Sequence, residues 1–492
     1  MDELATRAAA LVARRPGDAR LRRVGTSRAG TPLWLLSVGH GSRQALVVAG
    51  PHANEPVGGA TVLRLAERVL ADPRWSEGSD ATWNLLLCLD PDGSRRNEGW
   101  LSGPYTLGHY FRHFFRPGFL EQPEWLPDGA AAAALPETRA LLALQDELRP
   151  FFQCSLHGVD VGGGFVELTR DLPGLDRRVA HTAARLGIPR ELGAYDTLYW
   201  PGLGPAVYRI PPPRRGDRAA AITEAAVEST WFHPHRHGTV TAVVEAPMWG
   251  VAAVEDGSPS ANPDAVLRTV SHTLRHDART LERILARLRP HLPGSSAPGE
   301  PPAVTAPDAG AALPTALPPG ARARPHANAP APAVPPGVRP RPGDPAEAAR
   351  LLAPVDDYLL ICPGLADAWD PDVDAGTAAH PLPPLSTAHL ATLRIAGRRL
   401  ALRTAGLLHQ VVTGAGRDPA DVLPELDLLL DQWCADYRDG CGARWIPVGR
   451  QVEYQSRVVL SAFELAGQYA SEGPRSGEPG WGTGTVVPMH RE

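Results

Sequence analysis

The sequence predicts a layered α/β fold with a largely parallel or mixed sheet, followed by a mainly helical C-terminal domain. Short apolar runs of strand length alternate with segments of helical periodicity up to about residue 292. A stretch rich in Pro, Ala and Gly then separates this part from residues 345–470, where helical spacing returns with few strand-like runs. We therefore expect two folded parts joined by a linker, as the chain length of 492 residues also favours.

Each expected element has a local reason. A helix is expected in residues 1–24, ending near Pro16 and Gly17. The apolar or β-branched runs predict strands at 32–38, 45–49, 84–89, 151–156 and 239–244. Apolar residues at helical spacing predict helices at 57–71, 136–148, 265–292, 390–413 and 420–437. The run NLLLCL at 84–89 is apolar throughout, which is typical of a central strand covered on both faces.

The composition sets the expected boundaries. Residues 1–292 are expected to form the first domain and 345–470 a helical domain to which the sequence assigns no role. Residues 293–344 carry almost no large apolar side chains, so we expect a disordered, extended linker. The Gly-rich end over 471–492 is expected to be a flexible tail.

Charge and cysteine content exclude several classes of protein. The net charge of -5 gives no electrostatic case for binding nucleic acid or an anionic membrane. No apolar run approaches the length of a membrane span, and the N-terminus lacks the pattern of a secretory signal. The five cysteines are odd in number and dispersed, which favours reduced thiols and a cytoplasmic location.

Polar residues follow several of the predicted strands. His52 and Glu55 come just after the strand at 45–49, His157 follows the strand at 151–156, and Glu245 follows the strand at 239–244. An α/β sheet places its ligand site at the carboxyl ends of its strands, so we expect these four side chains to meet. An imidazole nitrogen and a carboxylate oxygen three residues apart can bind one metal ion.

These motifs resemble the M14 (carboxypeptidase A-like) zinc carboxypeptidases. The pieces that carry the resemblance stand in the order of that family within residues 25–290: HANE at 52–55, DPDG at 90–93, PETRAL at 136–141, SLHG at 155–158 and VVEAP at 243–247. The resemblance implies an α/β/α sandwich with a mixed central sheet and one zinc ion per chain. It also implies hydrolysis of a peptide or amide bond next to a free carboxylate.

The resemblance also implies roles for single residues. His52, Glu55 and His157 would bind Zn²⁺ and leave a fourth position open for water, as a catalytic zinc site requires. Glu245 would take the proton of that water and pass it to the leaving amine. One arginine would stabilise the oxyanion, and another would bind the terminal carboxylate.

The substrate-binding part of the pattern departs from the family. The family usually has Asn where this chain has Asp90, and it has a later Asn-Arg pair where this chain has only Arg96-Asn97 in the reverse order. Arg96 and Asn97 are therefore predicted to bind the substrate carboxylate, with Arg112 as the second choice. Tyr195, Tyr199 and Tyr208 are the candidates for the family's active-site tyrosine.

Other interpretations stay open. The same pattern of metal ligands also resembles the aspartoacylase and succinylglutamate desuccinylase type of deacylase. The substrate would then be an N-acyl amino acid. The third interpretation is a metal-binding scaffold that does not hydrolyse a substrate and whose helical domain docks a partner. Two further histidine groups, His109 with His113 and the alternating set at 233, 235 and 237, have metal-like spacing; for the alternating set we expect a solvated loop.

Overall fold

A mixed sheet lies at the centre of the molecule, as the sequence predicts. The computed structural model describes residues 1–126, 134–211, 229–292, 344–373, 382, 384–415, 418 and 421–472. Within these residues the strands form one sheet in the order β1-β2-β4-β3-β5-β9-β6-β8-β7, and β10 pairs with β9. The strands are β1 (Ala19–Thr26), β2 (Pro32–Val38), β3 (Arg43–Ala49), β4 (Ala81–Leu86), β5 (Phe152–Gly162), β6 (Phe165–Leu168), β7 (Gly202–Gly204), β8 (Val207–Arg209), β9 (Val240–Gly250) and β10 (Arg444–Trp445).

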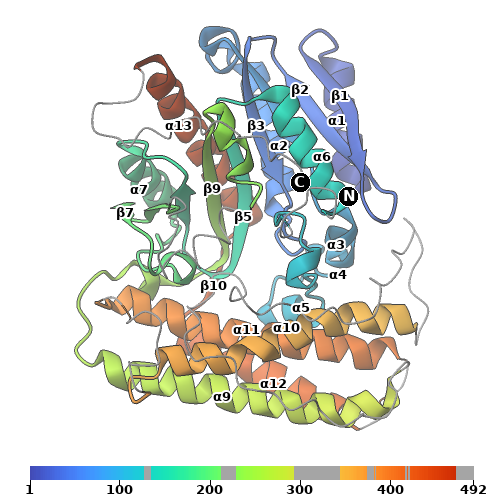
Figure 1. Ribbon diagram of the computed structural model, residues 1–492, viewed down its shortest axis with the longest axis vertical. Coiled ribbons are helices and arrows are strands. Elements are labelled where there is room, and N and C mark those ends of the chain that lie inside the picture. Colours follow the sequence, from blue (N-terminus) through green and yellow to red (C-terminus); the bar gives the residue numbers. More distant parts are fainter. Residues whose placement is uncertain are drawn as a thin grey trace, which may run out of the picture.

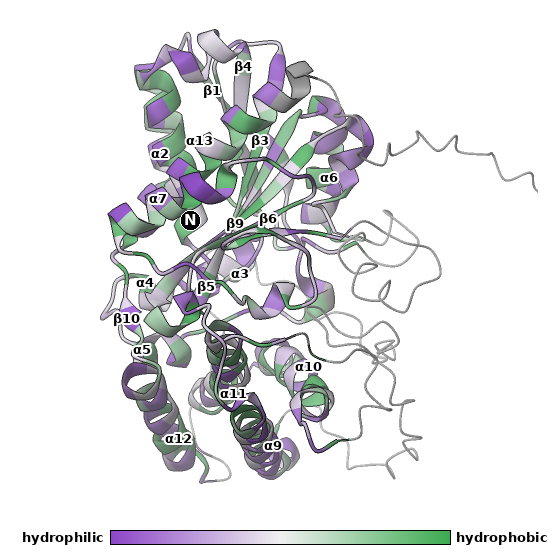
Figure 2. Ribbon diagram, turned by 90° about the vertical axis from the view of Figure 1, so that its left-hand side faces the viewer, coloured by the Kyte–Doolittle hydropathy of each residue, from purple (hydrophilic) through white to green (hydrophobic). Residues whose placement is uncertain are grey.

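Parallel pairing is confined mainly to the middle of the sheet. β4, β3, β5 and β9 are parallel neighbours, whereas β1, β2 and β6 join this core antiparallel. Every residue of β4 and β5 is buried, because helices cover both faces of the central strands. Figure 2 shows the central strands as apolar, with polar residues on the outer surfaces of the helices.

Helices cover the two faces of the sheet unequally (Figure 1). One hydrophobic core joins the sheet to four helices: α1 (Asp2–Arg14), α2 (Val57–Ala71), α7 (Leu175–Leu186) and α13 (Val448–Glu472). A smaller core on the other face joins it to α6 (Pro136–Leu148). This is the α/β/α arrangement that the resemblance implies.

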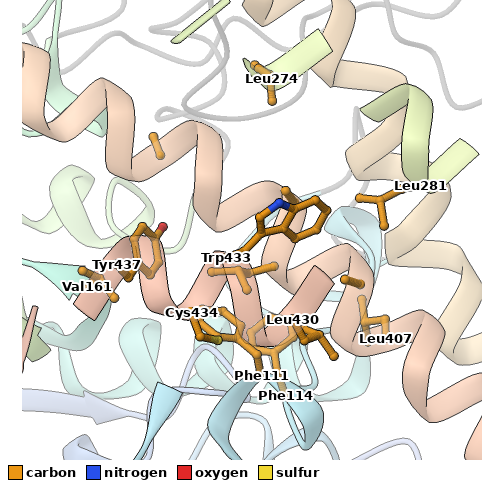
Figure 3. Close-up of a cluster of buried hydrophobic side chains, with 14 of the residues drawn as sticks. Phe111, Phe114, Val161, Leu274, Leu281, Leu407, Leu430, Trp433, Cys434 and Tyr437 are labelled. Atoms are coloured by element: carbon orange, nitrogen blue, oxygen red, sulfur yellow. The ribbon is translucent and has the colours of Figure 1, made fainter. Parts of the chain in front are cut away.

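A helical bundle lies at one end of the sheet (Figure 1). It consists of α9 (Pro263–Leu288), α10 (Pro345–Trp369), α11 (Thr387–Gly414) and α12 (Leu423–Ala435), against which α5 (Leu107–Arg112) packs; α3 (Pro91–Arg96) and α4 (Glu98–Leu101) precede α5. Figure 3 shows their common core, in which Phe111 and Phe114 from the α5 region meet Leu407, Leu430 and Trp433 from the later helices. The helical segment thus shares a core with residues from the first half of the chain.

The N-terminal element differs from the expectation. A helix was expected over 1–24, but α1 ends at Arg14 and β1 begins at Ala19. Pro16 and Gly17 end the helix, as expected, and the following residues pair antiparallel with β2. β1 is an edge strand in which most residues are exposed or partly exposed and several are arginines. It therefore lacks the apolar run by which the other strands are predicted.

The domain boundaries stay a prediction, but the contacts of α13 bear on them. The last described helix leaves the bundle and packs on α2, α7 and β9 of the sheet layer. The predicted linker at 293–344 and tail at 471–492 lie outside the described residues, apart from Asp344 and the last two residues of α13.

Two further findings concern membrane-spanning helices and disulfide bonds. In the part of the chain that the structure describes, no helix has both the length and the apolar character needed to cross a membrane. The five cysteines are free thiols.

Candidate active site

Parallel strands bring the predicted polar residues to one edge of the sheet. β3, β5 and β9 are adjacent, and His157 on β5 is in register with Glu245 on β9. Residues in register on neighbouring strands point to the same face, so both side chains face one cavity. The chain leaves β3 at Gly50, whose φ of 59° is readily adopted only by glycine, and the next turn carries His52 and Glu55.

Three side chains form a compact group of potential metal ligands. One ligand atom from each of His52, Glu55 and His157 lies within 4.8 Å of the others, and all three residues are buried. His52 Nδ1 lies 3.0 Å from both carboxylate oxygens of Glu55, and His157 Nδ1 lies 3.5 Å from Glu55 Oε2. The imidazole rings are 4.6 Å apart and nearly perpendicular. The structure therefore brings together the residues predicted to bind metal.

The other nitrogen of each ring has a partner of its own. Glu124 Oε2 lies 2.7 Å from His52 Nε2, and the Ser155 hydroxyl lies 2.9 Å from His157 Nε2. These contacts leave Nδ1 of both rings for the shared position. A metal-binding histidine in proteins has a polar partner on its second nitrogen in the same way. This donor set, two imidazole Nδ1 atoms and one carboxylate, fits a zinc ion with an open fourth position.

Glu124 is a site residue that the sequence analysis missed. Its carboxylate is fully buried and lies against the two histidines: Oε2 is 2.7 Å from His52 Nε2, and Oε1 is 3.7 Å from His157 Nε2. A buried carboxylate without a cationic partner is costly, and the two histidines are the groups that it faces. It lies in an irregular segment with no periodicity, so only the tertiary contact reveals it.

The ionisation of Glu55 and His157 suits metal binding, whereas His52 differs: burial lowers its pKa, but the carboxylates of Glu55 and Glu124 outweigh burial and raise it above the ordinary value. Burial lowers the pKa of His157 to about 4, so the ring is neutral at neutral pH. Burial opposes the ionisation of Glu55, but His52 and Arg116 outweigh it and hold the pKa of Glu55 well below its usual range. A neutral imidazole and an ionised carboxylate are the forms that bind a metal ion.

Glu245 stands beside this group without belonging to it. Glu245 Oε1 lies 3.7 Å from His157 Nδ1, and Oε2 has no hydrogen-bond partner in the described part of the chain. Burial, together with the neighbouring carboxylates of Glu55 and Glu167, raises its pKa well above the ordinary value. A bound cation would act in the opposite direction. An unengaged carboxylate next to a metal site can serve as a general base.

Arg116 is the cation nearest to the ligand group. Its NH1 donates to Glu55 Oε1 over 3.2 Å, and its Nε donates to Gln122 Oε1 over 3.1 Å. The guanidinium lines the cavity and is held by these two bonds. It is therefore a cation held in a fixed position beside the ligand group.

The structure does not bring the three predicted substrate-binding residues to the cavity. Arg96 forms a bidentate ion pair with Glu347 of α10 and covers the ring of Phe115. Asn97 is fully buried and donates to the backbone oxygens of Ala53 and Phe115, so it holds the loop that carries His52 and Glu55 in place.

Arg112, the second choice, is also engaged elsewhere. It donates to Asp427 and Asp431 of α12 over 2.8 to 3.0 Å. Like Arg96, it joins the first half of the chain to the bundle. These partners lie more than 200 residues away in sequence, so no local pattern could show that these arginines were already paired.

The cavity has a volume of about 220 Å³ and walls from both halves of the chain. Strands and loops of the sheet layer contribute the potential ligands His52, Glu55 and His157. They also contribute Glu167, Glu245 and Trp231. Helices α10 and α11 contribute one side of the wall, with these residues: Pro354, Asp357, Tyr358, Ile361, Ala396, Arg399, Leu400 and Arg403. Of the three tyrosines considered from sequence, Tyr195 lines the cavity.

The other histidine groups show no metal-binding arrangement among the described residues beyond the one above. The rings of His109 and His113 lie 4.4 Å apart and are tilted by 51° relative to each other. His233 and His237 both contact Asp146, and Arg236 occupies the space between them. A solvated loop was predicted for the second group, but in the structure residues His233–His237 form a 3₁₀ helix in which the three histidines are partly buried.

Comparison with known proteins supports the resemblance over part of the chain. Residues 6–103 match the Peptidase_M14 family model, described as zinc carboxypeptidase. The predicted resemblance to the M14 zinc carboxypeptidase family is confirmed. The matched region contains His52 and Glu55 but not His157 or Glu245. No curated protein sequence matches this chain.

The solved structures that are similar to this chain are distant from it in sequence. A protein from Shewanella denitrificans, named provisionally as a metallopeptidase, is 14% identical over 50% of this chain and 81% of its own, with a TM-score of 0.35. Metallo-carboxypeptidase from Burkholderia cenocepacia is 16% identical over 49% of this chain and 59% of its own, with a TM-score of 0.31. Bovine thrombin-activatable fibrinolysis inhibitor is 12% identical over 49% and 84%, with a TM-score of 0.30. At these values no activity carries over from them.

Proposed function

We propose that the protein is a zinc-dependent hydrolase that cleaves a peptide or amide bond next to a free carboxylate. The observation that supports it most is the convergence of His52, Glu55 and His157 through Nδ1 and carboxylate atoms, with Glu245 unengaged beside them. The family match gives the same chemistry independently for the part of the chain that carries His52 and Glu55.

The roles follow from position. His52, Glu55 and His157 would hold one zinc ion, which supplies a Lewis acid that acidifies water and polarises a carbonyl group. Glu245 accepts a proton from the attacking water and delivers it to the leaving amine. Arg116 faces the same space and stabilises the negative charge on the carbonyl oxygen. Glu124 and Ser155 keep the two rings oriented.

The enclosure of the site favours a small substrate. α10 and α11 form a wall of the cavity, and its volume of about 220 Å³ suits a short peptide or an acylated amino acid. Two kinds of enzyme with this chemistry act on such small substrates: a carboxypeptidase and an N-acyl amino acid deacylase. Comparing hydrolysis of acetylated amino acids with that of longer peptides separates them.

Metal analysis and one substitution test the proposal. Purified protein should contain about one zinc ion per chain. The variant Glu245→Gln should keep the metal and the fold but lose turnover by at least about 100-fold, because the base is absent. Glu147→Gln, which changes an exposed carboxylate of α6 that pairs with Arg22, is the matched control and should keep full activity. A Glu245→Gln protein that still hydrolyses at the wild-type rate would refute the role of Glu245.

A further inference from the structure

The ligand loop, residues 50–56 with His52 and Glu55, belongs to no helix or strand, so contacts with other segments must hold it in place. β3 ends at Ala49 and α2 begins at Val57, and a backbone hydrogen bond from Glu55 N to His52 O over 3.2 Å connects the two potential ligands. Groups that bind a metal ion must be held to within about 0.5 Å of the productive geometry. The residues that fix this loop therefore belong to the site even where they touch no metal.

Asn54, between the two potential ligands, ties the ligand loop to a buried carboxylate. Its Nδ2 donates to Asp160 Oδ1 over 3.1 Å, and the Tyr110 hydroxyl donates to the same oxygen over 2.7 Å. Asp160 lies on β5 three residues after His157, and both Asn54 and Asp160 are fully buried. One carboxylate thus connects the ligand loop to the strand that carries the third potential ligand.

A cation from the helical bundle neutralises this carboxylate. Arg403 of α11 donates through Nε to Asp160 Oδ2 over 2.8 Å, and its NH2 lies 2.7 Å from the same oxygen. The guanidinium also lies over the ring of Phe114, at 5.0 Å from the ring centroid. Burial lowers the pKa of Arg403, but the charge of Asp160 outweighs burial and raises it, so Arg403 stays charged. Without Arg403, Asp160 would be a buried charge that has lost its ion-pair partner, which is costly.

We propose that Arg403 is a positioning residue for the metal site and acts on the ligand loop through Asp160 and Asn54. The inference rests on the proposed zinc-dependent function and gives the helical bundle a part in it, although α11 lies outside the region that the family model matches. Arg403 holds Oδ2 of Asp160, so that Oδ1 stays turned toward Asn54. The ligand loop and β5 then keep the spacing at which one metal ion can bind to both.

Zinc affinity tests the proposal without any substrate. Zinc is titrated into full-length protein, freed of metal beforehand, in competition with a chromophoric chelator. Arg403→Met should weaken zinc binding by about 10-fold, as substitutions behind metal ligands do, and Arg403→Lys, which keeps the charge, should recover part of the loss. With Co²⁺ in place of zinc, the visible absorption spectrum of Arg403→Met should differ from that of wild type, because the ligand geometry changes.

Arg398→Met is the matched control. Arg398 lies on the same helix and also forms a largely buried ion pair, with Asp277 of α9, but its guanidinium lies over the ring of Trp433 in the bundle. Both substitutions should lower the urea midpoint of unfolding, but only Arg403→Met should weaken zinc binding. If zinc affinity fell equally in the two variants, lost stability alone would explain the effect and the proposal would be overturned.

A double variant tests the route through Asp160. In Arg403→Met with Asp160→Asn, an amide replaces the carboxylate that has lost its partner, and its oxygen can still accept the hydrogen bonds from Asn54 and Tyr110. This protein should bind zinc more tightly than Arg403→Met alone. A double variant that binds zinc no more tightly would contradict the route through Asp160.

The zinc titrations also separate this inference from the proposed function. Weaker zinc binding by Arg403→Met supports the role of Arg403 even if the wild-type protein hydrolyses neither peptides nor acyl amino acids, a result that would refute the hydrolase alone. Unchanged zinc binding by Arg403→Met, with an active wild-type enzyme, would refute the role of Arg403 alone. A wild-type protein that binds no zinc would refute both.

Discussion

At the scale of single residues, the site depends on which nitrogen of each imidazole is committed elsewhere. Glu124 and Ser155 contact the Nε2 atoms, so the Nδ1 atoms of His52 and His157 point together. The same ligand residues with the opposite ring orientation would not converge. The fully buried Glu124 is therefore as much a part of the site as the histidines that it orients.

Asp90 gives a prediction for the pH dependence of stability. It caps α3 by accepting a hydrogen bond from Gly93 N, but its second oxygen has no partner among the described residues. Burial raises its pKa from 3.8 to about 7, and the charge of Glu137 adds to the effect. Because the folded state holds a proton that the unfolded chain has already lost, Asp90 lowers stability progressively as the pH rises from about 4 to about 7.

Asp90→Asn should remove this loss of stability while keeping the hydrogen bond that caps α3. The free energy of unfolding of the variant, relative to wild type, should increase between about pH 4 and pH 7 and reach on the order of 2–4 kcal/mol at pH 8. Urea unfolding at a series of pH values measures the difference. Asp264→Asn, which changes an exposed carboxylate at the start of α9, should show no such trend. Parallel curves for Asp90→Asn and wild type would contradict the prediction.

At the scale of elements, the sequence analysis succeeded where periodicity is strong. The helices predicted at 57–71 and 136–148 have the same limits as α2 and α6, because a buried stripe and clear ends define both. The starts of β3, β4, β5 and β9 were predicted within three residues, since parallel central strands are continuously apolar, but β5 and β9 continue six residues beyond their predicted ends.

Most of the elements that were missed carry little local signal. β6, β7 and β8 are only three or four residues long, and β1 is charged and lies at an edge. Helix α7 was also not predicted, although it is a regular helix flanked by Gly174 and Gly187. The candidate site shows the same division. Residues at strand ends could be predicted, whereas Glu124, Arg116 and Arg403 owe their place to tertiary packing between distant segments.

The crossing of α11 with the α5 region gives a prediction at this scale. A Cβ atom on Gly406 would lie 2.0 Å from the backbone oxygen of Phe111, far closer than any real contact. Gly406→Ala should therefore displace α11 and lower the free energy of unfolding by about 1–3 kcal/mol. It should also lower activity, because α11 carries Arg403. Urea unfolding and steady-state kinetics measure the two effects.

Gly414 provides the matched control on the same helix. A Cβ atom there meets nothing within 4 Å, so Gly414→Ala should be neutral or slightly stabilising. If Gly406→Ala were as stable as Gly414→Ala, α11 would have to be free to shift, and the rigid placement of Arg403 would be refuted.

At the scale of the whole molecule, the two ends of the chain share one core. Tyr454, Val458 and Phe463 of α13 are buried against the face of the sheet that α1 and α2 also cover. Gln455 of α13 donates to the backbone oxygen of His157 over 2.7 Å, directly behind the metal group. The sheet layer is thus incomplete without the last described helix.

Truncation tests this dependence. A chain ended at residue 292 would expose the apolar surface that α13 covers, and we expect it to aggregate or to unfold without a cooperative transition. A chain ended at residue 472 keeps every described element and should unfold as the full-length protein does. Soluble yield and thermal unfolding compare the two. A stable, cooperative 1–292 fragment would support the predicted domain boundary instead.

The return of α13 to the sheet also affects the order of events during synthesis. The long strands of the sheet end at Gly250, but α13, the helix that covers one of their faces, begins only at Val448. The nascent sheet must therefore wait, with an apolar face uncovered, until the residues of α13 have also been made. Chaperone protection during that interval should matter more for this protein than for one whose layers close in the order in which they are made.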